Sequence, residues 1–158
     1  MSGYGKVYSA KRAGRRRTGL PGEDAAGVMT LDEFHELAAK PSYRMRGETL
    51  VTGGTDEAFD AALTALRLGS EKVTLVCPER AAEMRARPDK IDEAKQSGVK
   101  IIRGWGPARI SVHTDGAVSG VFFKHCERAF DSEGDFAPIY DKANVMGQYC
   151  DNLIVTEN

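Results

Sequence analysis

The chain has 158 residues, which is enough for one compact domain with its own core. A hydrophobic content of 41% and a charged content of 28% are ordinary for a globular protein, and the net charge of −1 gives no general attraction to nucleic acid or anionic membranes. No apolar run approaches the roughly 20 residues of a membrane-spanning helix, and the amino terminus lacks the apolar stretch of a signal peptide. We therefore expect a cytoplasmic protein with no nucleic-acid or membrane partner.

The first 29 residues are rich in Gly, Arg and Ser and contain the turn signal Pro21-Gly22. They predict an extended linker ahead of a folded domain at residues 30–158. The basic cluster at residues 11–17 has no interleaved aromatic side chains, which favours a solvated linker over a nucleic-acid site.

Cysteine usage argues against a disulfide framework and against a metal site. The three cysteines, Cys77, Cys126 and Cys150, are far apart and odd in number. They are expected to be reduced, mostly buried thiols.

The chain then alternates between helical and strand patterns. Thr30 and Glu33 form a capping box at the start of a short amphipathic helix. Strand, helix, strand, helix and strand follow with tight turns, which indicates βαβ units and a parallel sheet. The predicted strands are residues 48–52, 72–77 and 99–104. The helices between them are residues 56–68 and a helix that Pro88 opens and Gly98 closes.

The pattern changes after the third strand. Two strand-like runs flank Asp115-Gly116, a hairpin signal. A looser segment, Phe130–Tyr149, precedes a last strand within residues 151–157. We therefore predict an α/β fold with a central parallel sheet and an antiparallel β-meander, the Rossmann-like three-layer (ββα) arrangement of FAD/NAD(P)-binding domains.

The turn after the first of these parallel strands resembles a dinucleotide-binding turn with one glycine missing. In a Gly-x-Gly-x-x-Gly/Ala pattern the three positions would be Gly53, Thr55 and Ala58. The amino terminus of the following helix suits a pyrophosphate. Thr55 either blocks the phosphate with its branched side chain or donates its hydroxyl to it, and Asp56 suits a helix cap better than an anion site.

The end of the second parallel strand is where the cofactor is selected in such folds. Glu79 at this point favours the ribose of NAD, whereas Arg80, Arg85 and Arg87 offer charges for the 2′-phosphate of NADP. Trp105, after the third strand, either covers a nicotinamide or fills the edge of the core.

Several stretches carry a family resemblance from Thr18 to the C-terminus. They are TGLPGEDAAGVMTLDEF, VTGGTDEAFDAALTALRLGSEKVTLVC, EMRARPDKIDEAKQSGVKII, FDSEGDFAPIYD and CDNLIVTEN. The chain resembles the pyridine-nucleotide domain of the glutamate synthase small-subunit family, which includes the N-terminal part of dihydropyrimidine dehydrogenase.

The resemblance implies a domain that binds NAD or NADP and presents the nicotinamide to FAD held by a neighbouring domain of the same or a partner chain. Electrons then pass to iron–sulfur clusters or partner subunits. The cofactors carry the chemistry, so no catalytic side chain and no metal ligand are expected. The residues expected to hold the cofactor are Gly53, Gly54, Thr55, Asp56, Glu57, Glu79, Arg80 and Arg85.

The chain departs from the family pattern at important positions. Thr55 replaces the third of three consecutive glycines, Asp56 replaces an asparagine, and Pro78-Glu79 replaces a basic pair. The flavin domain's own glycine fingerprint is absent, which favours one domain of a longer flavoprotein, inactive alone. Two alternatives stay open: a non-catalytic domain kept for assembly, and a binder of an unrelated phosphorylated metabolite.

Overall fold

The computed structural model describes residues 18–156, so the basic cluster at residues 11–17 lies outside the described residues. Eight strands, three α-helices and one 3-10 turn, η1, follow one another in this range. Their bounds are β1 Val28–Thr30, α2 Leu31–Ala38, β2 Glu48–Thr52, α3 Asp56–Arg67, β3 Lys72–Cys77, η1 Ala81–Glu83, α4 Pro88–Ser97, β4 Lys100–Arg103, β5 Trp105–Val112, β6 Val118–Phe130, β7 Phe136–Tyr149 and β8 Asn152–Val155.

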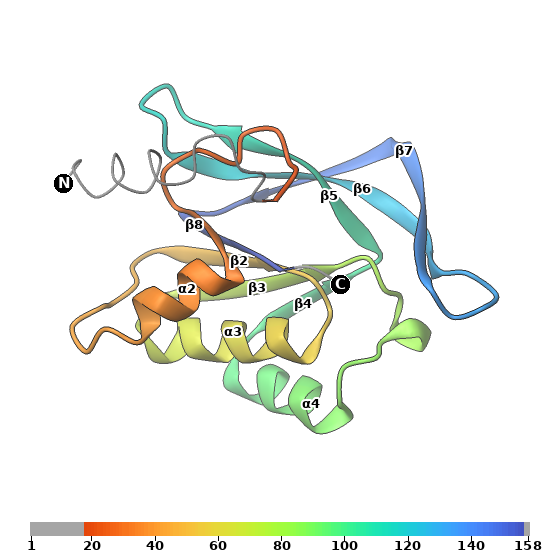
Figure 1. Ribbon diagram of the computed structural model, residues 1–158, viewed down its shortest axis with the longest axis horizontal. Coiled ribbons are helices and arrows are strands. Elements are labelled where there is room, and N and C mark those ends of the chain that lie inside the picture. Colours follow the sequence, from red (N-terminus) through yellow and green to blue (C-terminus); the bar gives the residue numbers. More distant parts are fainter. Residues whose placement is uncertain (1–17, 157–158) are drawn as a thin grey trace.

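Five parallel strands form the central sheet in the order β1-β8-β2-β3-β4. Helix α3 connects β2 to β3, and α4 connects β3 to β4 (Figure 1), which confirms the predicted βαβ units. At the centre of the sheet Val51 of β2 pairs with Leu75 of β3 on one side and with Ile154 of β8 on the other. The last strand therefore returns beside the first strand of the βαβ units.

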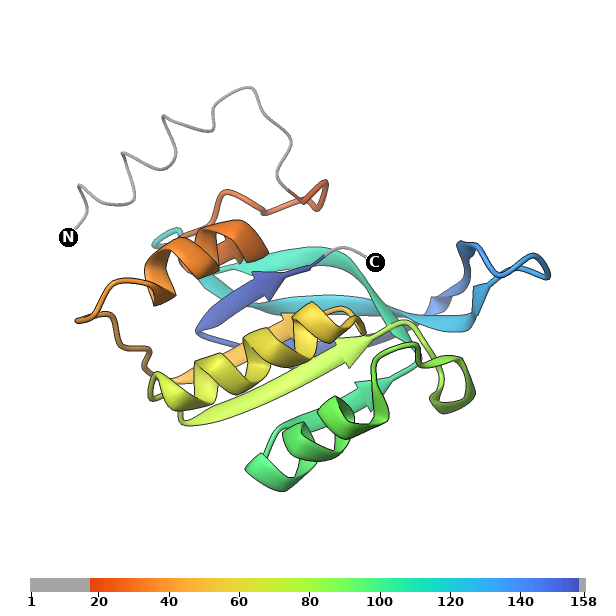
Figure 2. The ribbon, with the colours of Figure 1, turned by 60° about the horizontal axis from the view of Figure 1, so that its bottom comes forward.

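The molecule has three layers. Helices α2, α3 and α4 cover one face of the parallel sheet, and the antiparallel sheet β5-β6-β7 covers the other (Figures 1 and 2). Because neighbouring residues of a strand point to opposite faces, β2 sends Val51 towards the helices and Leu50 towards the second sheet. The parallel sheet is thus shared by two apolar clusters, one on each face.

The helices begin and end as their capping residues predict. Thr30 and Glu33 form the expected capping box of α2. Pro88 opens α4, and Gly98 closes it with a φ of 103° in the left-handed region. Asp115-Gly116 lies in the turn between β5 and β6, and Gly116 there has a φ of 92°. These local signals place the helices and the hairpin correctly.

The expectation of a loose segment at Phe130–Tyr149 is wrong. Strand β6 continues to Phe130, and β7 occupies Phe136–Tyr149 as the edge of the antiparallel sheet. Large side chains of β7 face the solvent, with Val145 and Tyr149 more than half exposed at 55% and 54%. An exposed edge strand with a register shift shows no alternation of polar and apolar residues, so its sequence does not indicate a strand.

The expected linker also contributes to the fold near its end. Val28 and Met29 of β1 are buried, and β1 pairs with β8. The folded part of the chain therefore begins before residue 30.

Candidate functional site

The turn after β2 lies at the carboxyl edge of the parallel sheet, where the chain order changes direction. From β2, the chain continues through α3 to β3 on one side, while β8 occupies the other side. Ligands of open α/β sheets bind at such a switch point. Gly53 adopts a φ of 120°, and its N–H donates to the carbonyl of Val76 at 2.9 Å. The left-handed backbone explains the glycine, because side chains are disfavoured in this conformation.

Thr55 is the N-cap of α3. Its hydroxyl oxygen accepts the N–H of Ala58 at 3.3 Å. The N–H groups of Asp56 and Glu57 also belong to the first turn, where the helix itself supplies no acceptor. A hydroxyl that accepts one hydrogen bond still has its own proton to donate. The Thr55 side chain is therefore compatible with an anion at the helix end.

The carboxylate of Asp56 binds the neighbouring helix. Its Oδ1 accepts the backbone N–H of Arg87 at 2.8 Å, at the N-cap of α4. One turn further along α3, Asp60 forms an ion pair of 2.7 Å with Lys90. The two contacts hold the starts of α3 and α4 together. Asp56 thus has a structural partner, and Glu57 is an exposed side chain of the same turn.

Glu79 reaches the turn from β3. The residue is 2% exposed, and its carboxylate lies beside Gly54. A Cβ atom on Gly54 would come within 2.6 Å of Glu79 Oε1 and 3.0 Å of Oε2, which is closer than real Cβ atoms approach. The second glycine of the turn therefore leaves room for an acidic side chain from the next strand.

Arg80 binds Glu83 in the short segment after β3. Its Nε lies 3.1 Å from Glu83 Oε1, and its backbone N–H donates to the same oxygen at 3.0 Å. The other oxygen of Glu83 accepts the N–H of Ala129 on β6 at 2.9 Å. Burial by itself would raise the pKa of Glu83, but these hydrogen bonds and the charge of Arg80 outweigh it and lower the pKa to about 2.

Arg85 contacts the far end of the β6–β7 hairpin. Its guanidinium donates to the carbonyl of Gly134 and lies 3.8 Å from the centre of the Phe130 ring. Of the residues predicted for the site, the fold brings Gly53, Gly54, Thr55 and Glu79 together at the turn. It directs Arg80 to Glu83 in the same segment and Arg85 to the hairpin of the second sheet.

The sequence did not indicate a role for Tyr140, which the fold brings to the same edge. A Cβ on Gly106 would come within 2.5 Å of the Tyr140 ring, and Lys124 Nζ lies 4.3 Å above that ring. Burial, with smaller contributions from Cys126 and Glu79, raises the pKa of Tyr140 to about 12. The only local signal was Gly106, a glycine inside a strand, which often marks a close approach of another group.

Trp105 lies at the edge of the core. It packs against the apolar cluster between the two sheets, and its ring stands edge-on to His125 with centroids 5.2 Å apart. The cysteines Cys77, Cys126 and Cys150 are buried free thiols. Burial raises the pKa of Cys77 to about 12, with a smaller effect from the charge of Glu79, so this thiol stays protonated.

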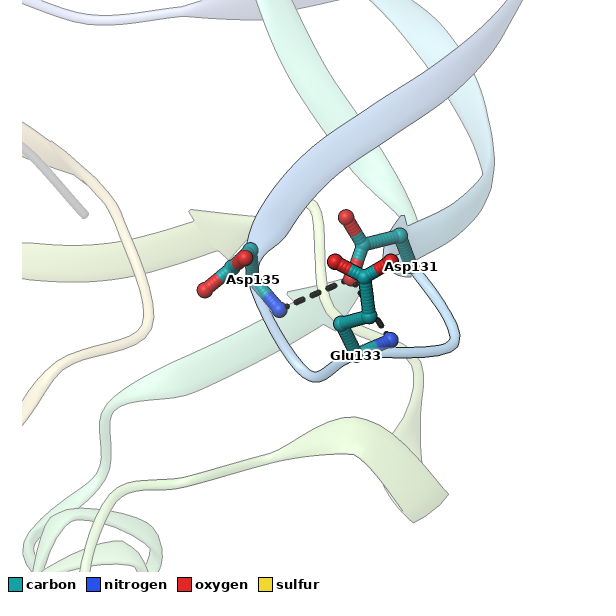
Figure 3. A group of neighbouring side chains, drawn as sticks. All are labelled: Asp131, Glu133 and Asp135. Atoms are coloured by element: carbon teal, nitrogen blue, oxygen red, sulfur yellow. Dashed lines mark hydrogen bonds between the residues drawn. The ribbon is translucent and has the colours of Figure 1, made fainter.

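Three acidic side chains gather at the tip of the β6–β7 hairpin. Oxygens of Asp131, Glu133 and Asp135 lie within 4.8 Å of one another. Figure 3 shows that Asp131 accepts the backbone N–H groups of the other two, each at 2.9 Å. The Asp131 carboxylate thereby closes the turn, a common use of aspartate in exposed loops.

In the part of the chain that the structure describes, no helix is both long and apolar enough to cross a membrane.

No protein-family model matches the chain. Two proteins of Escherichia coli (strain K12) are similar to it. AegA, named as an oxidoreductase, is 29% identical over 119 residues, which cover 68% of this chain and 18% of AegA. PreT, named as an NAD-dependent dihydropyrimidine dehydrogenase subunit, is 31% identical over 110 residues, which cover 68% of this chain and 25% of PreT. The chain thus spans a quarter or less of these relatives.

A solved structure resembles the chain more completely. Thioredoxin reductase of T. acidophilum superposes with a TM-score of 0.60, covering 90% of this chain and 40% of that protein at 14% identity. The parallel sheet, its helices and the antiparallel sheet on the other face agree with this comparison. The chain therefore has the Rossmann-like three-layer fold of FAD/NAD(P)-binding domains, as in thioredoxin reductase.

Proposed function

We propose that the chain is the pyridine-nucleotide-binding domain of a flavin-dependent oxidoreductase. In this proposal it holds NADH or NADPH so that the nicotinamide faces FAD on a neighbouring domain of the same or a partner polypeptide. Electrons then continue from the flavin to a further acceptor, such as an iron–sulfur subunit. A narrower relation to the glutamate synthase small-subunit family remains part of the proposal.

The observation that carries the proposal is the position of the Gly53-Gly54 turn. It connects the end of β2 to the amino terminus of α3 at the switch point of the sheet. The N–H groups of Asp56 and Glu57 face this end, and the helix dipole adds positive potential there. Similarity to two oxidoreductases supports the same function.

The residues at the turn fit a dinucleotide. The buried hydroxyl of Thr52, at the end of β2, has no hydrogen-bond partner within residues 18–156. With the first N–H groups of α3, it provides donors for a pyrophosphate. Glu79 offers a carboxylate to ribose hydroxyl groups beside Gly54.

Hydride transfer would be supplied by the bound nicotinamide and the flavin, and the side chains of this chain bind and orient the nucleotide. Cys77, kept protonated by burial, has no part in nucleophilic chemistry. Activity therefore requires the flavin domain, and the isolated chain is expected to bind without turnover.

The alternative is a domain that retains the fold for assembly without a nucleotide. The acidic side chains around the turn favour it, because Asp56, Glu57 and Glu79 place negative charge near the phosphate position. The contact between Asp56 and the Arg87 backbone reduces this objection, since that carboxylate is directed at α4.

The test is calorimetric titration of the chain with NADH and NADPH, for the wild type and for Thr55→Asp. Aspartate caps a helix as well as threonine does, but its charge repels a pyrophosphate. Thr114→Asp makes the same change of charge in the exposed β5–β6 turn and serves as the control.

We expect saturable binding by the wild type and Thr114→Asp, and affinity at least about tenfold weaker for Thr55→Asp. Absence of binding by the wild type up to millimolar nucleotide would contradict the proposal and favour the assembly domain. Tighter binding of inorganic phosphate or a mononucleotide than of either dinucleotide would instead indicate a phosphometabolite site.

A further inference from the structure

The two edges of the antiparallel sheet β5-β6-β7 are protected to different degrees. At the β5 edge the N–H of Ile110 donates to the carbonyl of Pro21 at 2.9 Å, so the segment before β1 covers that strand. Within residues 18–156, no backbone hydrogen bond joins the outer side of β7 to another element. An uncovered edge strand presents its unpaired N–H and C=O groups to another strand.

Strand β7 is protected along its first half only. Pro138, Asp141 and Lys142 lie there, and the register with β6 shifts between Asp141 and Val145. Prolines, charges and bulges are features that keep edge strands from pairing with other chains. The second half, residues 143–149, contains no charged residue and no proline. This half is therefore open to the addition of a strand.

Alternate residues of the second half face the free side of β7. The N–H of Cys150 donates to a carbonyl of β6 at 3.2 Å. Because successive residues of a strand alternate, the backbone groups of Val145, Gly147 and Tyr149 point away from β6. The side chains of Val145 and Tyr149 are each more than half exposed, whereas Met146 packs against the cluster between the sheets. The outer face of this edge is thus apolar and accessible.

The stretch is complementary to a second copy of itself. In an antiparallel pairing centred on Gly147, Val145 of each copy lies opposite Tyr149 of the other. Each opposed pair then exchanges two hydrogen bonds, which satisfies the outward backbone groups. A β-branched residue opposite an aromatic residue is a favourable cross-strand pair. At the two-fold axis glycine meets glycine, so no side chain separates the two strands there.

Charge also favours a second copy as the partner. Lys142 precedes the uncharged stretch and Asp151 follows it. The carboxylate of Asp141 accepts the N–H of Ala143 at 3.1 Å within its own chain. Antiparallel pairing brings the end that carries Lys142 in one copy to the end that carries Asp151 in the other. Opposite charges then flank the paired strands.

We propose that the chain forms a symmetric dimer in which the β7 edges of two copies pair over Val145–Tyr149. The antiparallel sheets of both copies become one continuous sheet, and the interface is the same surface on each copy. Interfaces of standard size begin at about micromolar affinity, and one pair of short strands is smaller than these, so the dimer is weak. This inference does not depend on nucleotide binding.

Sedimentation equilibrium of the full chain tests the proposal, with protein from about 10 μM to 1 mM. The wild type is compared with Val145→Lys, which puts a charge on the free edge. Val112→Lys is the matched control, because it makes the same change at an exposed valine of β5 in the same sheet. Circular dichroism establishes that each variant is folded.

We expect a dimer of the wild type and of Val112→Lys that is half formed at about 100 μM. Val145→Lys should weaken the association at least about tenfold, since two lysines then lie along the paired edges.

A cross-link provides a second measurement if Val145→Lys does not fold. In the opposed pair at Gly147 the Cα atoms would be about 5.5 Å apart, within the range that a disulfide spans. Gly147→Cys treated with oxidised glutathione should therefore yield a disulfide-linked dimer on a non-reducing gel. The native cysteines are buried, so the wild type should not cross-link, and Val112→Cys should not cross-link either.

A wild type that stays monomeric at about 1 mM would overturn the proposal, and the β7 edge would then be left for a strand of another domain or protein. Equal weakening by Val145→Lys and Val112→Lys, or cross-linking of Val112→Cys but not Gly147→Cys, would also overturn it, because the copies would then meet through another surface.

Discussion

The Thr55 hydroxyl caps α3, and in the proposed function the same side chain stands where a phosphate would approach. Removing the hydroxyl by Thr55→Ala is expected to lower the free energy of unfolding by about 1 kcal/mol, whereas Thr55→Gly should cost only a few tenths of that. Urea denaturation followed by circular dichroism measures both values. Stability of Thr55→Ala equal to that of the wild type would show that the hydroxyl does not stabilise the helix.

Thr55→Gly also tests whether threonine, in place of the glycine of the family pattern, affects nucleotide binding. Glycine at position 55 removes the branched side chain and gives the backbone room to approach a phosphate. Thr55→Gly is therefore expected to bind NADH at least as tightly as the wild type in calorimetry. A marked loss of affinity in Thr55→Gly would mean that the hydroxyl itself is a ligand.

Glu83 connects the segment after β3 to the second sheet, and this contact depends on pH. Its pKa is lowered from 4.5 to about 2 in the folded chain, against the opposing effect of burial. A lowered folded pKa gives stability that is present above pH 4.5 and is lost as the pH falls towards 2. Glu83→Gln is expected to be about 1 kcal/mol less stable than the wild type at pH 7.

The difference between the wild type and Glu83→Gln should shrink between pH 4.5 and pH 2 in urea denaturation. Exposed Glu93→Gln, in α4, is the control and should stay within about 0.5 kcal/mol of the wild type. A pH-independent difference would mean that packing, rather than charge, accounts for the effect.

Single residues were predictable where their role depends on neighbours in the chain. Gly53 and Thr55 occupy the end of a strand and the start of a helix, so their positions followed from the sequence. The partners of Arg85 and Glu83 could not be predicted from the sequence. Arg85 binds Gly134, 49 residues further along, and Glu83 binds Ala129, 46 residues further along. Such contacts depend on where the β6–β7 hairpin packs in the folded chain, and local sequence patterns do not indicate this.

At the scale of elements, the long β6–β7 hairpin depends on close backbone contact at Gly120. A Cβ on Gly120 would overlap the carbonyl oxygen of Gln148 on β7. Gly120→Ala is therefore expected to lower the free energy of unfolding by about 1–3 kcal/mol. Chemical denaturation measures the change.

Gly147→Ala is the matched control on the partner strand. Its Cβ would meet Phe122 Cε1 at 3.5 Å, an ordinary contact. This variant should remain within about 0.5 kcal/mol of the wild type. Equal effects of the two substitutions would mean that the contact with Gln148 does not determine the result.

The elements themselves were predictable to different degrees. Helices α2 and α4 and the parallel strands carry caps, apolar runs and closing glycines, and these signals are local. Strand β7 was not predicted because most of its residues are exposed and its sequence shows no alternation. Strand β1 was not predicted because three residues are too few for a periodic pattern. Strand β7 receives its order from the preceding strand, β6, and β1 from β8, which lies far away in the sequence.

At the scale of the whole molecule, the parallel sheet joins two apolar clusters into one structure. Ile154 of β8 belongs to the cluster beneath the helices, and Ile110 of β5 belongs to the cluster between the sheets. Leu153 and Ile154 are neighbours in β8 that contribute to opposite clusters. Loss of packing on either face should therefore weaken the sheet that both faces share.

This arrangement predicts one cooperative unfolding transition. Ile154→Val and Ile110→Val should each lower the free energy of unfolding by about 1 kcal/mol. Trp105 fluorescence reports on the cluster between the sheets, and far-ultraviolet circular dichroism reports on the helices and strands together. For each variant the two signals should change at the same urea concentration, as in a two-state transition. If Ile110→Val shifted only the fluorescence transition, the antiparallel sheet would unfold separately, and the turn at Gly53 could remain formed without it.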